Sequence, residues 1–90
     1  MRMTIRKSIA LIKRHENIKV IVNARNKISE DYKRSVHDLK DILINDADNV
    51  EIRLNDRIIE ISVKELKFNA GLMATVFYKE NCVIVFTYEN

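Results

Sequence analysis

The sequence predicts an α+β fold, a two-layer sandwich in which two main helices and one short helix cover a mostly antiparallel sheet of about five strands. Three patterns predict it: an amphipathic N-terminal segment, a central run that alternates between apolar and polar residues, and two β-rich apolar runs near the C-terminus. The 90 residues fit a single domain over residues 1–90. The expected order is helix, strand, helix, strand, strand, short helix, strand, strand.

The first helix is predicted from apolar residues that recur at helical spacing. Ile5, Ile9 and Ile12 lie on one side when residues are placed 100° apart, and basic residues occupy the other side. Thr4 is placed to cap the N-terminus of this helix, and Asn17 is expected to end it. The helix should therefore bury an apolar stripe and turn a basic face to solvent.

A strand and a second helix are expected next. Residues 18–24 are β-branched and mostly alternate, which is typical of a strand. After the loop of residues 25–27, Ser29 is a suitable N-cap for a helix that runs to about Asn45. Its expected buried stripe consists of Tyr32, Val36, Leu39, Ile42 and Leu43. His37 falls on the opposite side of this helix, among charged neighbours, and is expected to be solvated.

Alternation of apolar and charged residues is clearest in the middle of the chain. A two-residue turn at positions 55–56 makes Ile52 face Ile59, and Val50 face Ile61. All four apolar side chains then lie on one side of the hairpin. The sequence therefore predicts a hairpin that covers one side of the core, packed against the second helix.

The last third of the chain is predicted to hold a short helix and a second hairpin. A capping-box pattern that begins at Ser62 predicts a helix over about residues 63–69. Two β-rich runs, residues 72–78 and 82–88, then form the hairpin. Because positions 83–86 are all apolar, we expect a central strand that is covered on both faces.

The residues that carry enzymatic chemistry are few, and the sequence predicts a protein that is not an enzyme. Cys82 is the single cysteine, so it excludes an intrachain disulfide and cannot build a cysteine metal site. We expect it to be a small buried residue. A single cysteine is also typical of a protein from a reducing, cytoplasmic compartment. One glycine, Gly71, excludes the glycine-rich loops that hold nucleotide phosphates. His15 is expected at the end of the first helix. We therefore expect no catalytic group, metal or cofactor, and no apolar run approaches the roughly 18 residues of a membrane span.

Charge is distributed unevenly along the chain. Residues 1–27 carry eight basic residues and one acidic residue, a net charge of +7, and residues 28–90 carry eight basic and twelve acidic residues, a net charge of −4. The basic residues of the first segment are Arg2, Arg6, Lys7, Lys13, Arg14, Lys19, Arg25 and Lys27. We expect the helix and the loop after the first strand to join in one positive surface that binds nucleic acid phosphates without sequence specificity.

Two functions fit this surface, beside the possibility that it is simply a solvated helix face. The first is a small regulatory protein that binds nucleic acid. The alternative is a stoichiometric inhibitor or adaptor, of the type that phages and mobile elements encode, which docks on an acidic or nucleic-acid-binding protein surface. A composition rich in Ile, Lys and Asn, whose codons are AT-rich, suits both.

Overall fold

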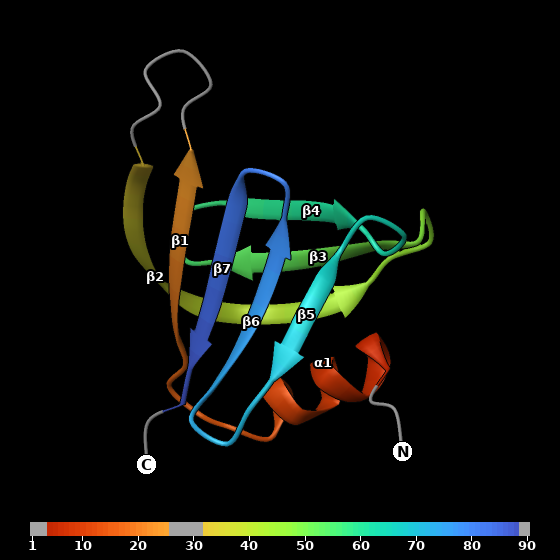
Figure 1. Ribbon diagram of the computed structural model, residues 1–90. Coiled ribbons are helices and arrows are strands. Elements are labelled where there is room, and N and C mark those ends of the chain that lie inside the picture. Colours follow the sequence, from red (N-terminus) through yellow and green to blue (C-terminus); the bar gives the residue numbers. More distant parts are fainter. Residues whose placement is uncertain (1–3, 26–31, 89–90) are drawn as a thin grey trace.

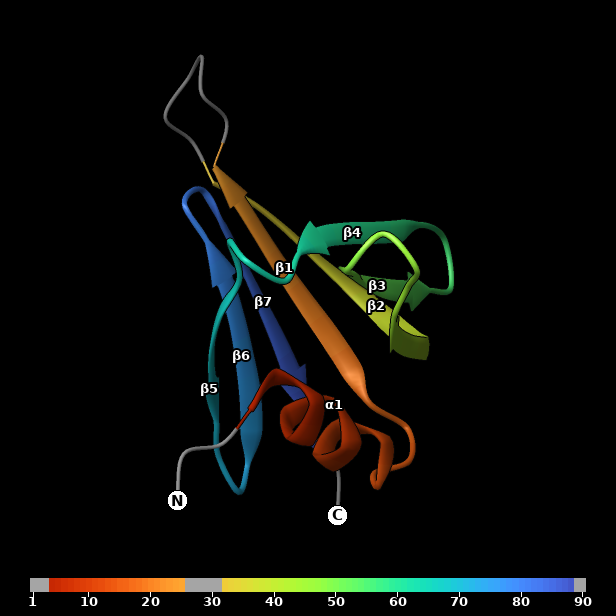
Figure 2. The ribbon, with the colours of Figure 1, turned by 90° about the vertical axis from the view of Figure 1, so that its right-hand side faces the viewer.

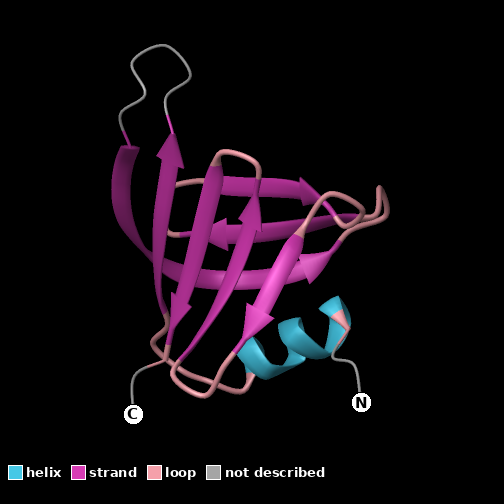
Figure 3. Cartoon of the chain, viewed as in Figure 1, coloured by secondary structure: helices cyan, strands magenta, loops and turns pink. Residues whose placement is uncertain are grey.

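The computed structural model describes residues 4–25 and 32–88, and in these ranges the chain is dominated by β-strands (Figures 1 and 3). One helix precedes seven strands. In chain order they are α1 (Ile5–Lys13), β1 (Lys19–Arg25), β2 (Tyr32–Ile44), β3 (Asn49–Leu54), β4 (Ile58–Ser62), β5 (Lys67–Ala70), β6 (Ala74–Lys79) and β7 (Cys82–Thr87).

The strands form one antiparallel sheet in the order β4-β3-β2-β1-β7-β6-β5. The sheet folds over on itself, so that β3, β4 and the end of β2 cross behind β1, β7, β6 and β5 (Figures 1 and 2). The 13-residue β2 takes part in both layers. It does so because its register shifts between Leu39 and Asp41, and such a bulge bends a strand. Helix α1 covers one open end of the two layers (Figure 2).

The core lies between the two layers and under α1. The ring of Phe77 on β6 meets that of Phe86 on β7 edge to face, with centroids 4.9 Å apart, and meets that of Phe68 on β5 at 6.4 Å. Ile52 from the second layer and Ile12 from α1 are fully buried against the same core. Helix α1 therefore packs on the core through its apolar side, and its basic side faces solvent.

The first helix and its cap are confirmed. The Thr4 side chain accepts a hydrogen bond from the backbone N–H of Lys7 at 3.2 Å. The helix ends at Lys13, and Asn17 adopts a left-handed conformation, with φ of 55°, in the loop that leads to β1. This conformation is one that asparagine tolerates better than most residues. It turns the chain sharply from the helix into the first strand.

The central hairpin is also confirmed. Val50 pairs with Ile61, and Ile52 pairs with Ile59, as the alternation predicts. The backbone N–H of Leu54 donates to the carbonyl of Arg57 at 2.8 Å and closes the two-residue turn. The hairpin packs on the other sheet layer, not on a second helix.

The predicted second helix is wrong, because this segment is the long strand β2. Ser35 and His37 point inward by strand alternation, while Val36 points outward and is 58% exposed. The bulge then adds one residue, so that the next inward positions are Leu39 and Ile42, three residues apart. A spacing of three is also the spacing of a helix, which is why the sequence pattern resembles one.

The predicted short helix is wrong as well. The carbonyl of Ser62 accepts hydrogen bonds from the N–H groups of Glu65 and Leu66, both at 3.1 Å, which makes a single turn. The chain then enters β5, where Phe68 pairs with Phe77. The α+β sandwich with two main helices and about five strands is therefore corrected to a mostly β fold with seven strands and one helix in the described ranges.

The strand β7 is central, but the described structure covers it on one face only. Ile84 and Phe86 are fully buried, whereas Val83 points to the opposite face and is 37% exposed. The expectation that apolar residues at every position mark a strand covered on both faces is therefore wrong for the described part of the molecule.

Candidate functional site

Four basic side chains surround one small residue on the exposed side of α1. A rotation of 100° per residue puts Arg6 above Lys13, and Lys7 above Arg14, with Ala10 between the two pairs. All five residues are exposed, and the first turn holds no acidic residue. We call Arg6, Lys7, Lys13 and Arg14 the basic helix face. It presents positive charge over two helical turns, with a small residue at its centre.

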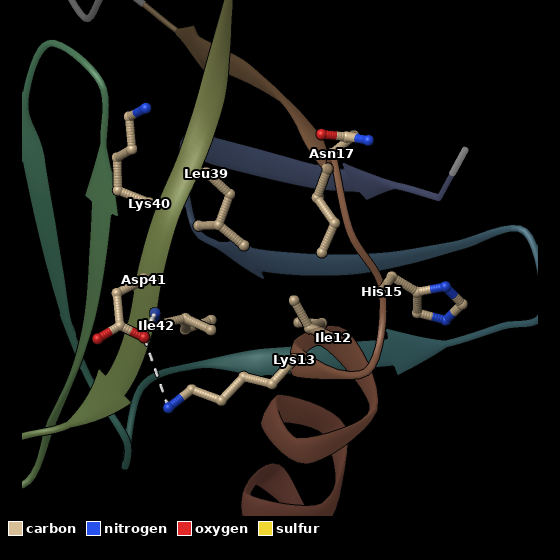
Figure 4. Close-up of a pocket in the computed structure, with 9 residues that line it drawn as sticks. Ile12, Lys13, His15, Asn17, Leu39, Lys40, Asp41 and Ile42 are labelled. Carbon is tan, nitrogen blue, oxygen red and sulfur yellow. Dashed lines mark hydrogen bonds and ion pairs between the residues drawn. The ribbon is translucent and has the colours of Figure 1, made fainter. Parts of the chain in front are cut away.

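A groove runs along one side of this face, where α1 meets the second half of β2. It consists of three hollows of about 180, 300 and 300 Å³. Lys13 lines the first two hollows, and Asn17 and Leu39 line both the second and the third, so the three hollows lie next to one another. We call this feature the α1/β2 groove. Its central hollow is drawn in Figure 4.

The floor of the groove is apolar and its rim is polar. Ile12 and Ile42 are fully buried beneath the groove, beside the half-buried Leu39 (Figure 4). Ile18, which is 5% exposed, also lines it. The bulge in β2 turns Leu39 and Ile42 toward the helix and leaves Lys40 exposed. Because these isoleucines are buried, Leu39 supplies most of the apolar surface that the groove exposes, and the groups that solvent reaches are mainly the charged ones on its rim.

Two ion pairs lie on the rim. The Lys13 ammonium is 3.5 Å from the carboxylate of Asp41, and Lys19 directly contacts Asp38. The hydrogen bond and the charge of Lys19 hold the pKa of Asp38 below its usual value. All four side chains are about half exposed, so solvent screens both pairs.

The groove nevertheless carries an excess of positive charge. Arg6, Lys13, Lys19 and Lys40 line it, against the two carboxylates of the ion pairs. Within residues 4–25 and 32–88, no ion pair joins Arg6 or Lys40 to a carboxylate. The excess positive charge of the groove therefore comes from Arg6 and Lys40, which form no ion pair with these carboxylates.

The structure brings together five of the eight basic residues expected at the site. These are the four residues of the basic helix face, and Lys19 at the start of β1. Arg25 is at the other end of β1, seven residues long, which places the two backbones roughly 20 Å apart. We expected the helix and the loop after β1 to form one positive surface. The backbone of Arg25 is too far from that of Lys19 to belong to the same surface. The side chain of Arg25, and all of Arg2 and Lys27, lie outside the described part of the chain.

Lys40 is a groove residue that the sequence analysis missed. The sequence analysis predicted a helix over this segment and assigned no role to this lysine. Its sequence signal is the phase break at Leu39-Lys40-Asp41, where two inward positions are three residues apart. In a strand, that break indicates a bulge, and Lys40 extends from it over β2 on the side away from α1 (Figure 4).

His37 forms a buried cluster that the sequence analysis placed in solvent. Its side chain is 4% exposed, its Nδ1 is 2.7 Å from the carboxylate of Asp56, and its Nε2 is 2.7 Å from the hydroxyl of Ser35. A hydroxyl, an imidazole and a carboxylate joined in this order also make up a nucleophilic triad. In such a triad the carboxylate is buried, whereas the side chain of Asp56 is 46% exposed. The cluster satisfies both ring nitrogens and ties β2 to the β3–β4 turn.

We expect His37→Ala to lower the free energy of unfolding by about 1–3 kcal/mol, because it removes both hydrogen bonds and leaves a small cavity. Urea denaturation measures this change. Ser62→Ala serves as a control, because Ser62 also lies in a strand but its side chain has no hydrogen bond among the described residues. Equal effects of the two changes would contradict the role of the cluster.

The remaining candidates for chemistry are isolated. Cys82 is a half-buried free thiol, and burial raises the pKa of this group, which lowers its thiolate fraction at neutral pH. In the described ranges, no three His, Cys, Asp or Glu side chains are grouped so that they could hold a metal ion. Nor does this part of the chain contain a helix long and apolar enough to cross a membrane.

Comparison of the chain with protein-family models, with curated proteins and with solved structures gave no match. No family is therefore assigned to the chain. Function is inferred from the groove, the basic helix face and the exposed surfaces alone.

Proposed function

We propose that the protein is a small, non-enzymatic regulatory protein that binds nucleic acid through the α1/β2 groove and the basic helix face. The observation that carries this proposal is the line of four cationic side chains along one groove, which continues onto a helix face with two further cations. A run of cations along one surface is complementary to the regularly spaced phosphates of a nucleic acid.

The ion pairs on the rim do not prevent this binding. Exposed pairs contribute about 0–1 kcal/mol, so Lys13 can exchange Asp41, at 3.5 Å, for a phosphate at small cost. Ala10 adds no bulk at the centre of the basic helix face, so a phosphate chain can approach the helix closely. Contacts of this kind position a nucleic acid without reading its bases, and they support binding without sequence specificity.

The experiment that tests the proposal is a salt titration of affinity. Fluorescence anisotropy with labelled oligonucleotides of mixed sequence gives the dissociation constant at each salt concentration. With about four phosphate contacts, the logarithm of the association constant should fall with the logarithm of salt concentration with a slope near −3. Absence of binding at low salt, or an affinity independent of salt, would contradict the proposal.

A second candidate function is docking on a partner protein, and the outer face of the sheet favours it. A row of apolar residues crosses four strands in register: Val36, Ile21, Val85 and Val76. Val36 is 58% exposed, and the other three are half-buried. Tyr78, 41% exposed, adds an aromatic ring to this face. Exposed apolar patches often mark protein interaction sites. Nuclease treatment separates the two candidates, because it removes a nucleic acid and leaves a protein partner bound.

We also propose that the protein is located in the cytoplasm. The single cysteine supports this, because a reducing compartment suits a free thiol such as that of Cys82.

A further inference from the structure

We infer that the outer face of the sheet is the interface of a homodimer, in which a second copy of this chain packs its own outer face against it. The two copies are related by a two-fold axis along the row of Val36, Ile21, Val85 and Val76, which we call the apolar row. The face belongs to β1, β7, β6, β5 and the first half of β2, and it lies toward the viewer in Figure 1. The inference does not depend on nucleic acid binding.

The strand β7, at the centre of this face, is the first observation. Its residues 83–86 are all apolar, a pattern typical of a strand that is covered on both faces. Its inner side chains are buried, but Val83 is 37% exposed on the outer face. Six large apolar side chains are exposed in the described ranges, and Val36, Tyr78 and Val83 all lie on this face. The pattern therefore predicts a second cover, which the described part of one chain does not supply.

The size of the face is the second observation. Five strands about 4.8 Å apart make it about 24 Å wide, and the six residues of β6 or β7 make it about 20 Å long. Each partner of a specific complex buries about 600–1,000 Å² of accessible surface. The projected area of the face is about 480 Å², and side chains that stand out from the sheet add to it. Its size therefore suits a weak dimer.

The third observation is the shape of the two rows beside the apolar row. One row contains Asp38 on β2 and Ala74 on β6, and the other contains Arg34 on β2 and Tyr78 on β6. A two-fold axis along the apolar row lays each strand over its own copy and exchanges these two rows. The bulky Tyr78 then lies over the small Ala74 of the second copy. The face is therefore complementary in shape to itself.

The charges of the same two rows are complementary as well. The axis places Arg34 over Asp38 of the second copy, once on each side of Val36. Arg34 is exposed and forms no ion pair within residues 4–25 and 32–88. The carboxylate of Asp38 contacts Lys19 through one oxygen, so its second oxygen can accept from an arginine. The dimer thus gains two pairs of opposite charges.

The other simple two-fold axis, parallel to the strands, is unfavourable. It places β2 over β5 of the second copy, because these strands are at the two sides of the face. Arg34 and Lys67 belong to the same row, so each arginine would then meet a lysine. Like charges at an interface oppose association. The charges therefore favour the axis along the apolar row.

Sedimentation velocity of the purified, nuclease-treated protein tests the inference. We expect monomers at about 1 µM and mainly dimers at about 1 mM, as for an interface near the lower size limit. Val36→Glu brings two carboxylates together on the axis and should weaken the dimer by about 100-fold or more. Ile58→Glu is the matched control, because Ile58 is 60% exposed, close to the 58% of Val36, and lies on β4, outside the face. We expect it to change the dissociation constant by less than about 3-fold.

A pair of charge reversals tests the position of the axis. Arg34→Asp brings two carboxylates together at each contact, and Asp38→Arg brings two guanidinium groups together, so each variant alone should be monomeric at about 1 mM. An equimolar mixture of the two variants restores opposite charges at both contacts. We expect this mixture to form a heterodimer. Circular dichroism at low concentration shows whether both variants are folded.

A dimer that Val36→Glu removes, that Ile58→Glu retains, and that mixing the two charge variants restores supports the inference. A protein that stays monomeric at about 1 mM overturns it, and the outer face is then left to a different partner protein. A dimer that survives Val36→Glu uses another surface and overturns it as well. Failure of the mixture to associate overturns the axis and with it the inference. Nucleic acid affinity is measured separately, so the proposed function stands or fails independently.

Discussion

We expect Phe77→Ala to lower the free energy of unfolding by about 3–5 kcal/mol, the range for removal of a large aromatic side chain from a core. Phe77 is fully buried in the middle of β6, and its ring meets Phe68 and Phe86 at the edge-to-face geometry that aromatic pairs favour. Alanine removes both ring contacts and leaves a cavity between the two layers. The total stability of a domain is about 5–15 kcal/mol, so this one change should bring the protein close to unfolding.

Urea denaturation followed by circular dichroism measures the effect. Tyr78→Ala is the control, because Tyr78 is the next residue of the same strand, also aromatic, and points to the exposed face. We expect that control to change stability by less than about 1 kcal/mol. If the two variants were equally stable, the assignment of the inner and outer faces of β6 would be wrong.

The second large effect concerns affinity. Arg6→Glu combined with Lys13→Glu reverses two of the four cations along the α1/β2 groove, and both residues also belong to the basic helix face. Each reversal removes an attraction to phosphate and adds a repulsion, so we expect nucleic acid affinity to fall by about 100-fold or more at low salt. The salt slope should become shallower by about 0.7–0.9 for each phosphate that the protein no longer neutralises.

The matched control is Lys64→Glu combined with Lys67→Glu. It changes the net charge by the same four units, at exposed residues outside the groove. We expect it to lower affinity only slightly, and both double variants to melt close to the unmodified protein, since surface changes cost about 0.5 kcal/mol or less. If both double variants bound nucleic acid equally weakly, net charge and not the groove would explain binding.

Elements with one consistent pattern could be predicted from the sequence. The central hairpin alternates between apolar and polar residues in most of both strands and has a polar two-residue turn, so the sequence predicts correctly that Val50 lies opposite Ile61. The first helix has a single apolar stripe and a capping threonine, and its structure follows that pattern. In both elements, local propensity and burial favour the same conformation.

The long strand could not be predicted, because its bulge imitates helical spacing. Leu39 and Ile42 both face the core although they are three residues apart, and a sequence pattern cannot separate a helix from a bulged strand at this spacing. Because this segment was predicted to be a helix, the sequence also did not predict the groove that β2 forms with α1. The groove and the position of Lys40 depend on the packing of β2 against α1, and the burial of His37 depends on the β3–β4 turn. These contacts join segments distant in sequence, so no local pattern contains them.

The pairing of β1 with β7 has a consequence for synthesis of the protein. The carbonyl of Lys19 accepts a hydrogen bond from the hydroxyl of Thr87, 68 residues later in the chain. At translation rates of about 5–20 residues per second, that interval lasts about 3–14 s. During it, the nascent chain exposes the edge of β1 that will later bind β7, and an unpaired edge can pair with another chain. Yield of correctly folded protein in the cell should therefore depend on the rate of translation beyond residue 25 and on chaperones that bind nascent strands.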